Sequence, residues 1–156
     1  MFVKGDKISH PTHGAGVIDG IVDEKIDGID REFYVLKLMV NTMDVMIPVN
    51  TEVEIRYVLS ALEADEVLSS LGQAEEEETQ NWNKRYRDNM DRLKSGDLFE
   101  VARVVKSLTL RDKAKGLSTG ERKMLHFARQ ILISEIVLSK DSTYEEMEQE
   151  LDKALA

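Results

Sequence analysis

The spacing of hydrophobic and polar positions changes near residue 59. Before that point, apolar residues come in short runs separated by Gly, Asn and Asp, which is typical of β-strands. The predicted strands are 14–22, 31–40, 42–49 and 54–58. Asp27-Gly28 and Asn41-Thr42 fall where hairpin turns belong, and the first is the stronger turn dipeptide. Four or five short strands are too few for a two-sheet sandwich, so the pattern predicts a small SH3-like β-barrel.

From Ser60 onward the apolar positions recur with a helical period, as in the stripe of Leu98, Val101, Ala102, Val105 and Leu108. The predicted helices are near 60–71, 79–94, 97–114, 118–139 and 142–155. Three of these helices begin at Ser-x-x-Glu capping boxes, which start at Ser60, Ser118 and Ser142. Three end near a glycine, at Gly72, Gly96 and Gly116.

These two patterns predict a segregated α+β chain with two domains. Residues 1–58 form the β-barrel domain, and residues 59–156 form a compact all-helical domain. The first part of the second domain, residues 59–80, is expected to be a connecting helix followed by an acidic linker, since Glu75 to Glu78 are four consecutive glutamates.

Charge is distributed unevenly along the chain. The whole chain has a net charge of −9, which by itself argues against a nucleic-acid-binding protein. However, residues 81–140 hold 14 Lys and Arg against 7 Asp and Glu, a net of +7, whereas residues 1–80 hold 6 against 17, a net of −11. The tail, residues 141–156, is acidic again. A basic block between two acidic ones indicates two modules with different partners.

Candidate catalytic and metal-binding groups are few. There is no cysteine, so disulfides, thiol catalysis and cysteine-bound zinc are excluded. His10 and His13 lack an obvious third ligand and suit a turn in which they bond to the backbone. No serine has the setting of a nucleophile. The sequence therefore predicts no enzyme, no metal and no cofactor. No signal peptide or membrane-spanning run is recognisable, so a cytoplasmic location without membrane association is expected.

The segment around Trp82 has two interpretations. Trp82, Tyr86, Met90 and Leu93 have the spacing of a core stripe, which the residue pattern alone favours. The alternative is an aromatic wedge or stacking platform flanked by phosphate-binding cations, here Lys84, Arg85 and Arg87. Two more cations, Arg122 and Lys123, open the helix predicted at 118, where free amides attract phosphate.

Several stretches together resemble the CarD/CdnL family of bacterial transcription regulators, whose N-terminal module is shared with the polymerase-interacting domain of the transcription-repair coupling factor. The resemblance runs from Gly5 to about Lys140. Its most specific stretches are His10-Pro-Thr-His-Gly-Ala-Gly16, Phe33-Tyr-Val-Leu-Lys37, Asn81-Trp-Asn-Lys-Arg-Tyr86, Lys94-Ser-Gly-Asp97 and Gly116-Leu-Ser-Thr-Gly-Glu-Arg-Lys-Met-Leu125.

The resemblance implies a Tudor/SH3-like N-terminal domain that docks on the β subunit of RNA polymerase. It also implies a helical domain that contacts promoter DNA, without reading its sequence, at the upstream edge of the melted region. Trp82 matches the family's tryptophan, which wedges into the minor groove there, and this shifts the interpretation of Trp82 from core to wedge. The DNA-contacting residues are then expected to be Trp82, Lys84, Arg85, Arg87, Arg122 and Lys123. Such proteins take no small-molecule substrate or cofactor.

The expected polymerase-docking residues are Glu24, Val45, Met46, Ile47 and Pro48. Glu24 and Met46 stand where some relatives carry basic residues, so strand pairing and apolar contact are expected to dominate over charge at this surface. The function expected from all these features is stabilisation of the promoter open complex. The alternative is a protein–protein interaction adaptor without DNA contact, in which Trp82 belongs to the core. A sequence-specific repressor is a weaker alternative, because no one helix carries enough base-reading side chains.

Overall fold

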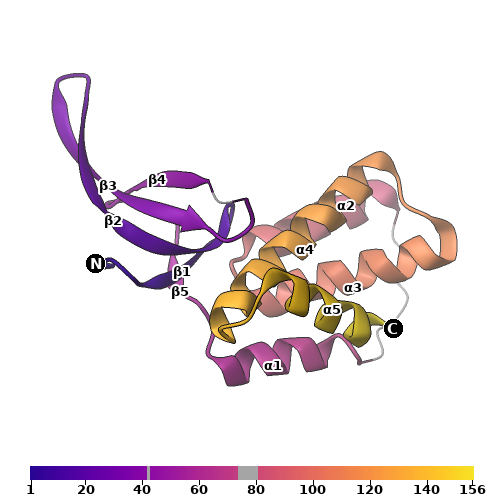
Figure 1. The fold of residues 1–156 in the computed structure, drawn as a ribbon. Helices are drawn as coiled ribbons and strands as arrows, with labels where there is room; N and C mark the ends of the chain where they lie inside the picture. The colour runs from indigo at the N-terminus through magenta and orange to yellow at the C-terminus, as the bar shows by residue number, and fades with distance from the viewer. Residues whose placement is uncertain (42, 74–80) are drawn as a thin grey trace.

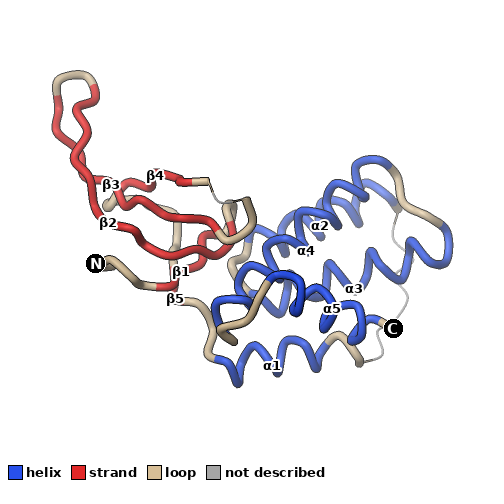
Figure 2. The backbone as a smooth tube through the Cα atoms, viewed as in Figure 1, coloured by secondary structure: helices blue, strands red, loops and turns tan. Residues whose placement is uncertain are grey.

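The computed structural model describes residues 1–41, 43–73 and 81–156. The predicted glutamate linker at Glu75 to Glu78, and Thr42 of the second predicted turn, lie outside the described residues. An antiparallel sheet forms the N-terminal part and five helices form the rest, which confirms the segregated α+β arrangement (Figures 1 and 2). None of the described helices is long and apolar enough to cross a membrane.

The sheet has five antiparallel strands in the order β4-β3-β2-β1-β5. Their bounds are β1 Lys7–His10, β2 Gly14–Ile26, β3 Ile29–Leu38, β4 Asp44–Pro48 and β5 Arg56–Tyr57. A closed barrel requires the two edge strands to pair, but the described part of the chain gives β4 and β5 no common ladder. The predicted SH3-like barrel is therefore wrong, and the sheet is open. The physical reason is the shortness of β5, whose two residues pair with β1 on one side and reach the helices on the other.

The hairpin of β2 and β3 is longer than predicted. Asp27 and Gly28 both have positive φ, at 51° and 77°, so the Asp-Gly dipeptide forms the expected tight turn. Pairing continues to the turn itself, where Ile26 faces Ile29. The distal part of this hairpin extends beyond the other strands and away from the helices (Figure 1).

One face of the sheet carries its own core. Ile8, Ile18, Tyr34, Leu36, Leu38 and Ile47 form this buried cluster. Alternation along the strands places the neighbouring residues, such as Val35 and Met46, on the opposite face. The strand β1, which was not predicted, contributes Ile8 to the cluster.

The five helices lie close to the predicted ranges. They are α1 Ala61–Ser70, α2 Trp82–Lys94, α3 Leu98–Lys115, α4 Thr119–Ser139 and α5 Tyr144–Leu155. Ser60 makes the complete capping box with Glu63, as predicted. The predicted box at Ser142 is one residue out, because the hydroxyl that accepts the amide of Glu146 belongs to Thr143. Gly96 and Gly116 have the positive φ expected after a helix, whereas α1 ends in Leu71 with right-handed helical geometry.

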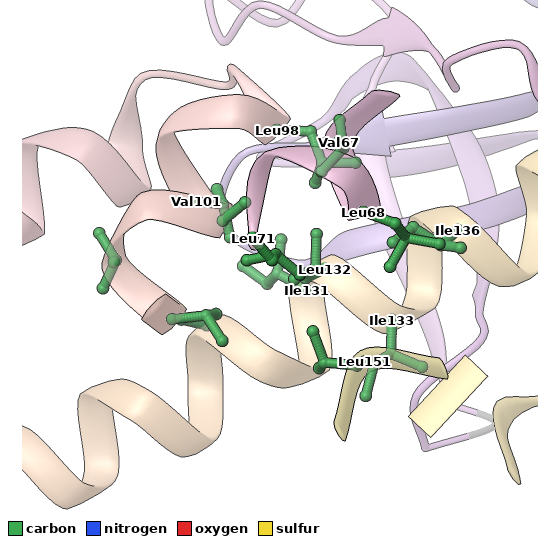
Figure 3. Close-up of a cluster of buried hydrophobic side chains, with 14 of the residues drawn as sticks. Val67, Leu68, Leu71, Leu98, Val101, Ile131, Leu132, Ile133, Ile136 and Leu151 are labelled. Atoms are coloured by element: carbon green, nitrogen blue, oxygen red, sulfur yellow. The ribbon is translucent and has the colours of Figure 1, made fainter. Parts of the chain in front are cut away.

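The helical core is organised around α4. Every residue from Ile131 to Leu138 is buried, because this half of α4 packs against α1, α3 and α5 and also against β2. Figure 3 shows Ile131, Leu132 and Ile136 of α4 among side chains from α1 and α3, with Leu151 of α5 beside Ile133. The helix α4 therefore connects the two domains, with its first turns in the helical domain and its second half against the sheet (Figure 1).

A candidate nucleic-acid interface and a docking edge

The first turns of α2 and α4 are tied together. Asn81 caps α2 by accepting the amide of Lys84, and Ser118 caps α4 by accepting the amide of Glu121. Two side-chain contacts join these turns: the indole N–H of Trp82 donates to Ser118 Oγ at 3.1 Å, and Arg85 pairs with Glu121 at 2.9 Å. We call residues 81–85 and 118–122 the paired helix N-termini. Two helix ends with their partial positive charges are thus presented together.

Trp82 lies partly in the helical domain and partly in solvent. Its ring stacks on Tyr86 with centroids 4.9 Å apart and planes 19° apart, and it packs against Gly120. The residue is nevertheless 42% exposed. The predicted core stripe therefore holds at Leu93, which is buried, and opens toward solvent at Trp82. One face and the N–H of the indole are used within the domain, and the remaining apolar surface is free to contact a partner.

Arg85 is inside the domain, contrary to its expected role in contacting DNA. It is 4% exposed, and it makes a bidentate ion pair with Glu121, Nε to Oε2 at 2.9 Å and Nη2 to Oε1 at 3.1 Å. The hydrogen bond from Arg85 holds the pKa of Glu121 below its usual value, although burial opposes this. The guanidinium is committed to a buried carboxylate, which does not favour the expected contact with DNA. Its role is to hold α2 against α4.

The other predicted cations are on the surface of the same two helices. Lys84 and Arg87 on α2, and Arg122 and Lys123 on α4, are all exposed. Arg122 is 3.9 Å from Asp112, a loose pair between exposed side chains. Four of the five predicted cations are thus exposed on the two helices whose first turns are joined at Trp82.

The predicted docking segment is an edge strand whose side chains point in two directions. Among the described residues β4 pairs with β3 alone, so its other side is available for strand addition. Met46 is exposed opposite Val35, and Pro48 is exposed opposite Phe33. Ile47 is buried in the sheet core, and half-buried Val45 packs against the same cluster. The side chain of Ile47 thus anchors the strand from inside, and only its main chain faces the free edge.

Glu24 is on the projecting hairpin, opposite Arg31. By strand alternation it lies on the same face as Val22 and Ile26, both of which are exposed. The sequence interpretation did not single out these two apolar residues. Their exposure depends on how far the hairpin extends past the rest of the sheet, which the residue pattern does not show.

The interpretation of His10 as a turn residue is confirmed. Its Nδ1 accepts the amides of Thr12 at 3.1 Å and His13 at 3.3 Å. Burial, together with the nearby His13, lowers the pKa of His10 to about 4. Over the part of the chain that the structure describes, no group of three or more His, Asp or Glu side chains is placed to hold a metal ion.

Sequence reasoning missed the residues that position the indole. Ser118 and Glu121 were recognised only as a helix cap, and their partners Trp82 and Arg85 precede them by 36 residues. The capping motif was the sequence signal for Ser118 and Glu121, and such a motif carries no information about contact with a second helix.

Comparison with known proteins gives matches over both domains. Residues 2–59 match the family described as the CarD-like/TRCF RID domain, and residues 66–152 match the family described as the C-terminal domain of CarD. A protein of Bacillus subtilis (strain 168), named "Putative transcription factor YdeB", is 34% identical over 145 residues, which is 92% of this chain and 95% of that protein.

Both domains, in the same order, are therefore those of a two-domain transcription regulator. The chain belongs to the CarD family, as its resemblance to CarD/CdnL proteins indicated.

Proposed function

We propose that this protein docks on the β subunit of RNA polymerase through its sheet and stabilises the promoter open complex through the paired helix N-termini. Family membership supports the general role, interaction with RNA polymerase in transcription regulation. The observation that carries the DNA-contacting part is the half-exposed Trp82, held by Ser118 and Tyr86 on two helices that also carry exposed cations.

Docking uses the free edge of β4. A strand of the polymerase pairs with this edge through main-chain hydrogen bonds, while Met46 and Pro48 offer apolar contact beside it. The buried side chain of Ile47 keeps β4 in register on β3. The sheet domain, residues 1–58, holds 6 Lys and Arg against 10 Asp and Glu, a net of −4, and it lacks a basic block like that at 81–140, so a protein suits it better as a partner than DNA does.

The indole contacts DNA by shape. Its N–H is already used by Ser118, so it has no donor left with which to read base edges. Its free apolar surface inserts at a base step that is already opening, where the unstacking cost of a few kcal/mol is smallest. Lys84, Arg87, Arg122 and Lys123 contact phosphates on either side. This arrangement favours forked DNA over duplex DNA without preferring a base sequence.

Docking compensates for weak DNA binding. Four phosphate contacts give a log–log salt slope of about −3.6, so binding of the free protein to DNA is weak at physiological salt. Docking raises the effective concentration of the helical domain at the promoter. Because the wedge contacts the open state and not the closed one, the open complex is favoured by the difference in affinity between the two states.

The test is the substitution Trp82→Ala with Phe127→Ala as its control. Phe127 is a second exposed aromatic residue in the helical domain, 39% exposed, on α4 but outside the paired helix N-termini. Loss of one stacking contact is worth about 1–3 kcal/mol, so Trp82→Ala is expected to shorten the lifetime of the open complex about tenfold. Phe127→Ala leaves the lifetime unchanged.

Binding of both variants to a β-subunit fragment is measured in parallel and is expected to equal that of the unsubstituted protein. An unchanged open-complex lifetime for Trp82→Ala overturns the wedge and supports an adaptor that makes no DNA contact. Loss of melting temperature without loss of lifetime assigns Trp82 to the domain core.

A further inference from the structure

The contact between the two domains contains a buried charge. Glu135, in the second half of α4, is 0% exposed. Arg56 of β5 donates to both of its oxygens, Nη1 to Oε2 at 2.6 Å and Nη2 to Oε1 at 2.9 Å. The backbone amide of Leu59 donates to Oε2 at 2.8 Å. A helix of one domain is thus bonded at a single carboxylate to the last strand of the sheet and to the chain segment that follows it.

Neighbouring contacts extend this joint across the sheet. Ser134, also 0% exposed, accepts the amide of Ala15 at the start of β2 at 3.1 Å. Gly14 leaves the space for it, since a Cβ there would be 3.1 Å from Ser134 Oγ. Lys7 of β1 donates to the carbonyl of Leu138 at 3.3 Å. The joint therefore holds α4 to β1, β2 and β5.

Arg56 also reaches a third segment. Its Nε donates to the carbonyl of Gly96, between α2 and α3, at 2.9 Å. With a fourth hydrogen bond, from Nη1 to the carbonyl of Tyr57 at 3.2 Å, this planar guanidinium group has little freedom to rotate. The geometry of this joint therefore sets the angle between the sheet and the helical domain.

The helix α4 also carries the residues that hold Trp82 in place. Glu121, which holds α2 through Arg85, is 14 residues before Glu135 on α4. At 1.5 Å per residue, these two attachment points are about 21 Å apart on one continuous helix. The position of Trp82 relative to the sheet is thus determined by α4 and by its two ion pairs.

From this geometry we infer that Arg56 and Glu135 are positioning residues, which convert docking of the sheet on the polymerase into a fixed placement of Trp82 at the DNA fork. The effect on the open complex rests on the proposed function, whereas the rigidity of the contact between the domains is a property of the isolated chain. The docking edge β4 and the joint strand β5 lie at opposite edges of the sheet, so loosening the joint leaves the docking surface intact.

The first experiment measures the angle between domains directly. The chain has no cysteine, so Lys37→Cys on β3 and Gln149→Cys on α5, both at exposed positions, provide two unique spin-label sites. In this background the inter-label distance distribution is expected to be narrow. Arg56→Met with Glu135→Met removes the charges together, which avoids leaving a buried carboxylate unpaired. The distribution is then expected to broaden at least twofold.

The matched control is Arg129→Met. Arg129 is on α4 like Glu135, but its 3.0 Å ion pair is with Asp152 of α5, within the helical domain. Its distance distribution is expected to stay narrow. If the double variant proves too unstable, Arg56→Lys keeps the charge but loses the bidentate geometry, and it gives the same comparison with a smaller broadening. A narrow, unshifted distribution in the folded variants overturns the inference.

The second experiment uses polymerase and a promoter. The double variant is expected to bind the β-subunit fragment and free forked DNA as the unsubstituted protein does. The lifetime of the open complex falls about tenfold, because a loose linkage lowers the effective concentration of the wedge at the fork. An unchanged lifetime, or weakened docking, overturns the positioning role. If Trp82→Ala has no effect either, the proposed function has failed while the distance measurement still decides the rigidity of the joint.

Discussion

The two halves of α4 use the same chemistry for different purposes. Near its start, Glu121 accepts a bidentate pair from Arg85 within the helical domain, and both side chains are almost fully buried. In its second half, Glu135 accepts a bidentate pair from Arg56 of the other domain, and the arginine keeps about a third of its side chain exposed. The first pair holds α2 against α4 at the proposed DNA-contacting site, and the second holds α4 against the sheet.

The two pairs indicate that a buried ion pair serves to fix a geometry more than to add stability. Buried ion pairs contribute little net stability, since desolvation offsets most of the attraction. They do specify one geometry, because each hydrogen bond has a direction. Between the two pairs along α4 lie the apolar side chains of Ile131, Leu132 and Ile133, which Figure 3 shows.

The largest difference between the two ion pairs is expected when each arginine is removed in turn. Arg85→Ala leaves the carboxylate of Glu121 buried without its main partner, so the free energy of unfolding is expected to fall by about 3–5 kcal/mol. Arg56→Ala is expected to cost about 2 kcal/mol, because water reaches Glu135 through the space that the partly exposed arginine leaves. Urea unfolding measures both. Equal losses would show that exposure of the arginine does not matter.

The stability of the two domains is expected to depend on pH in different ranges, because His10 of the sheet domain and Glu121 of the helical domain have different pKa values. The pKa of His10 is about 4 in the folded protein, below its ordinary value of 6.5, so only the unfolded chain takes up a proton between these values. Stability from this group is complete above pH 6.5 and is lost as the pH falls to about 4, by roughly 2–3 kcal/mol. Glu121 also has a lowered pKa, and its contribution is lost at more acidic pH, below its ordinary value of 4.5.

The measurement is the free energy of unfolding against pH for the unsubstituted protein and for His10→Gln. The variant is expected to have a flatter profile from pH 6.5 to 4 and the same further fall below pH 4. If its slope between pH 6.5 and 4 equals that of the unsubstituted protein, the loss in that range belongs to another group.

The smallest expected effect concerns Ser118, with Ser60 as its matched control. Each hydroxyl caps a helix by accepting the amide of the glutamate three residues on, so Ser118→Ala and Ser60→Ala should each cost about 1 kcal/mol. Ser118 alone also accepts the indole N–H. Because Trp82 is the only tryptophan, Ser118→Ala is expected to shift the fluorescence emission and Ser60→Ala is not. An unchanged spectrum in Ser118→Ala would show that the hydroxyl does not hold the ring.

Local features of the fold were predictable where neighbours in sequence decide them. The five helices, the Asp27-Gly28 turn and the cap at Ser60 follow from residue period and from short-range hydrogen bonds. The strand β1 was missed because its four residues are too few to show a period. The open sheet was missed because closure depends on whether the two edge strands meet.

The candidate site divides in the same way. The sequence indicated Trp82, the cations around it and the β4 segment, because unusual residue types stand out in a single chain. It did not distinguish Arg85, which is buried, from Lys84 and Arg87, which are exposed. All three are positively charged residues of α2, and they differ in environment because only Arg85 pairs with Glu121 of α4.

The sequence by itself determined the order of the domains, the position of the basic block at 81–140 and the family, because composition, period and motif spacing are properties of the chain. Tertiary structure alone decided which cations stay in water, which face of the indole is free and at what angle the sheet meets the helices. The physical reason is that each of these depends on a partner far away in sequence, Ser118 for Trp82 and Glu135 for Arg56, and such pairs exist only once α4 has packed.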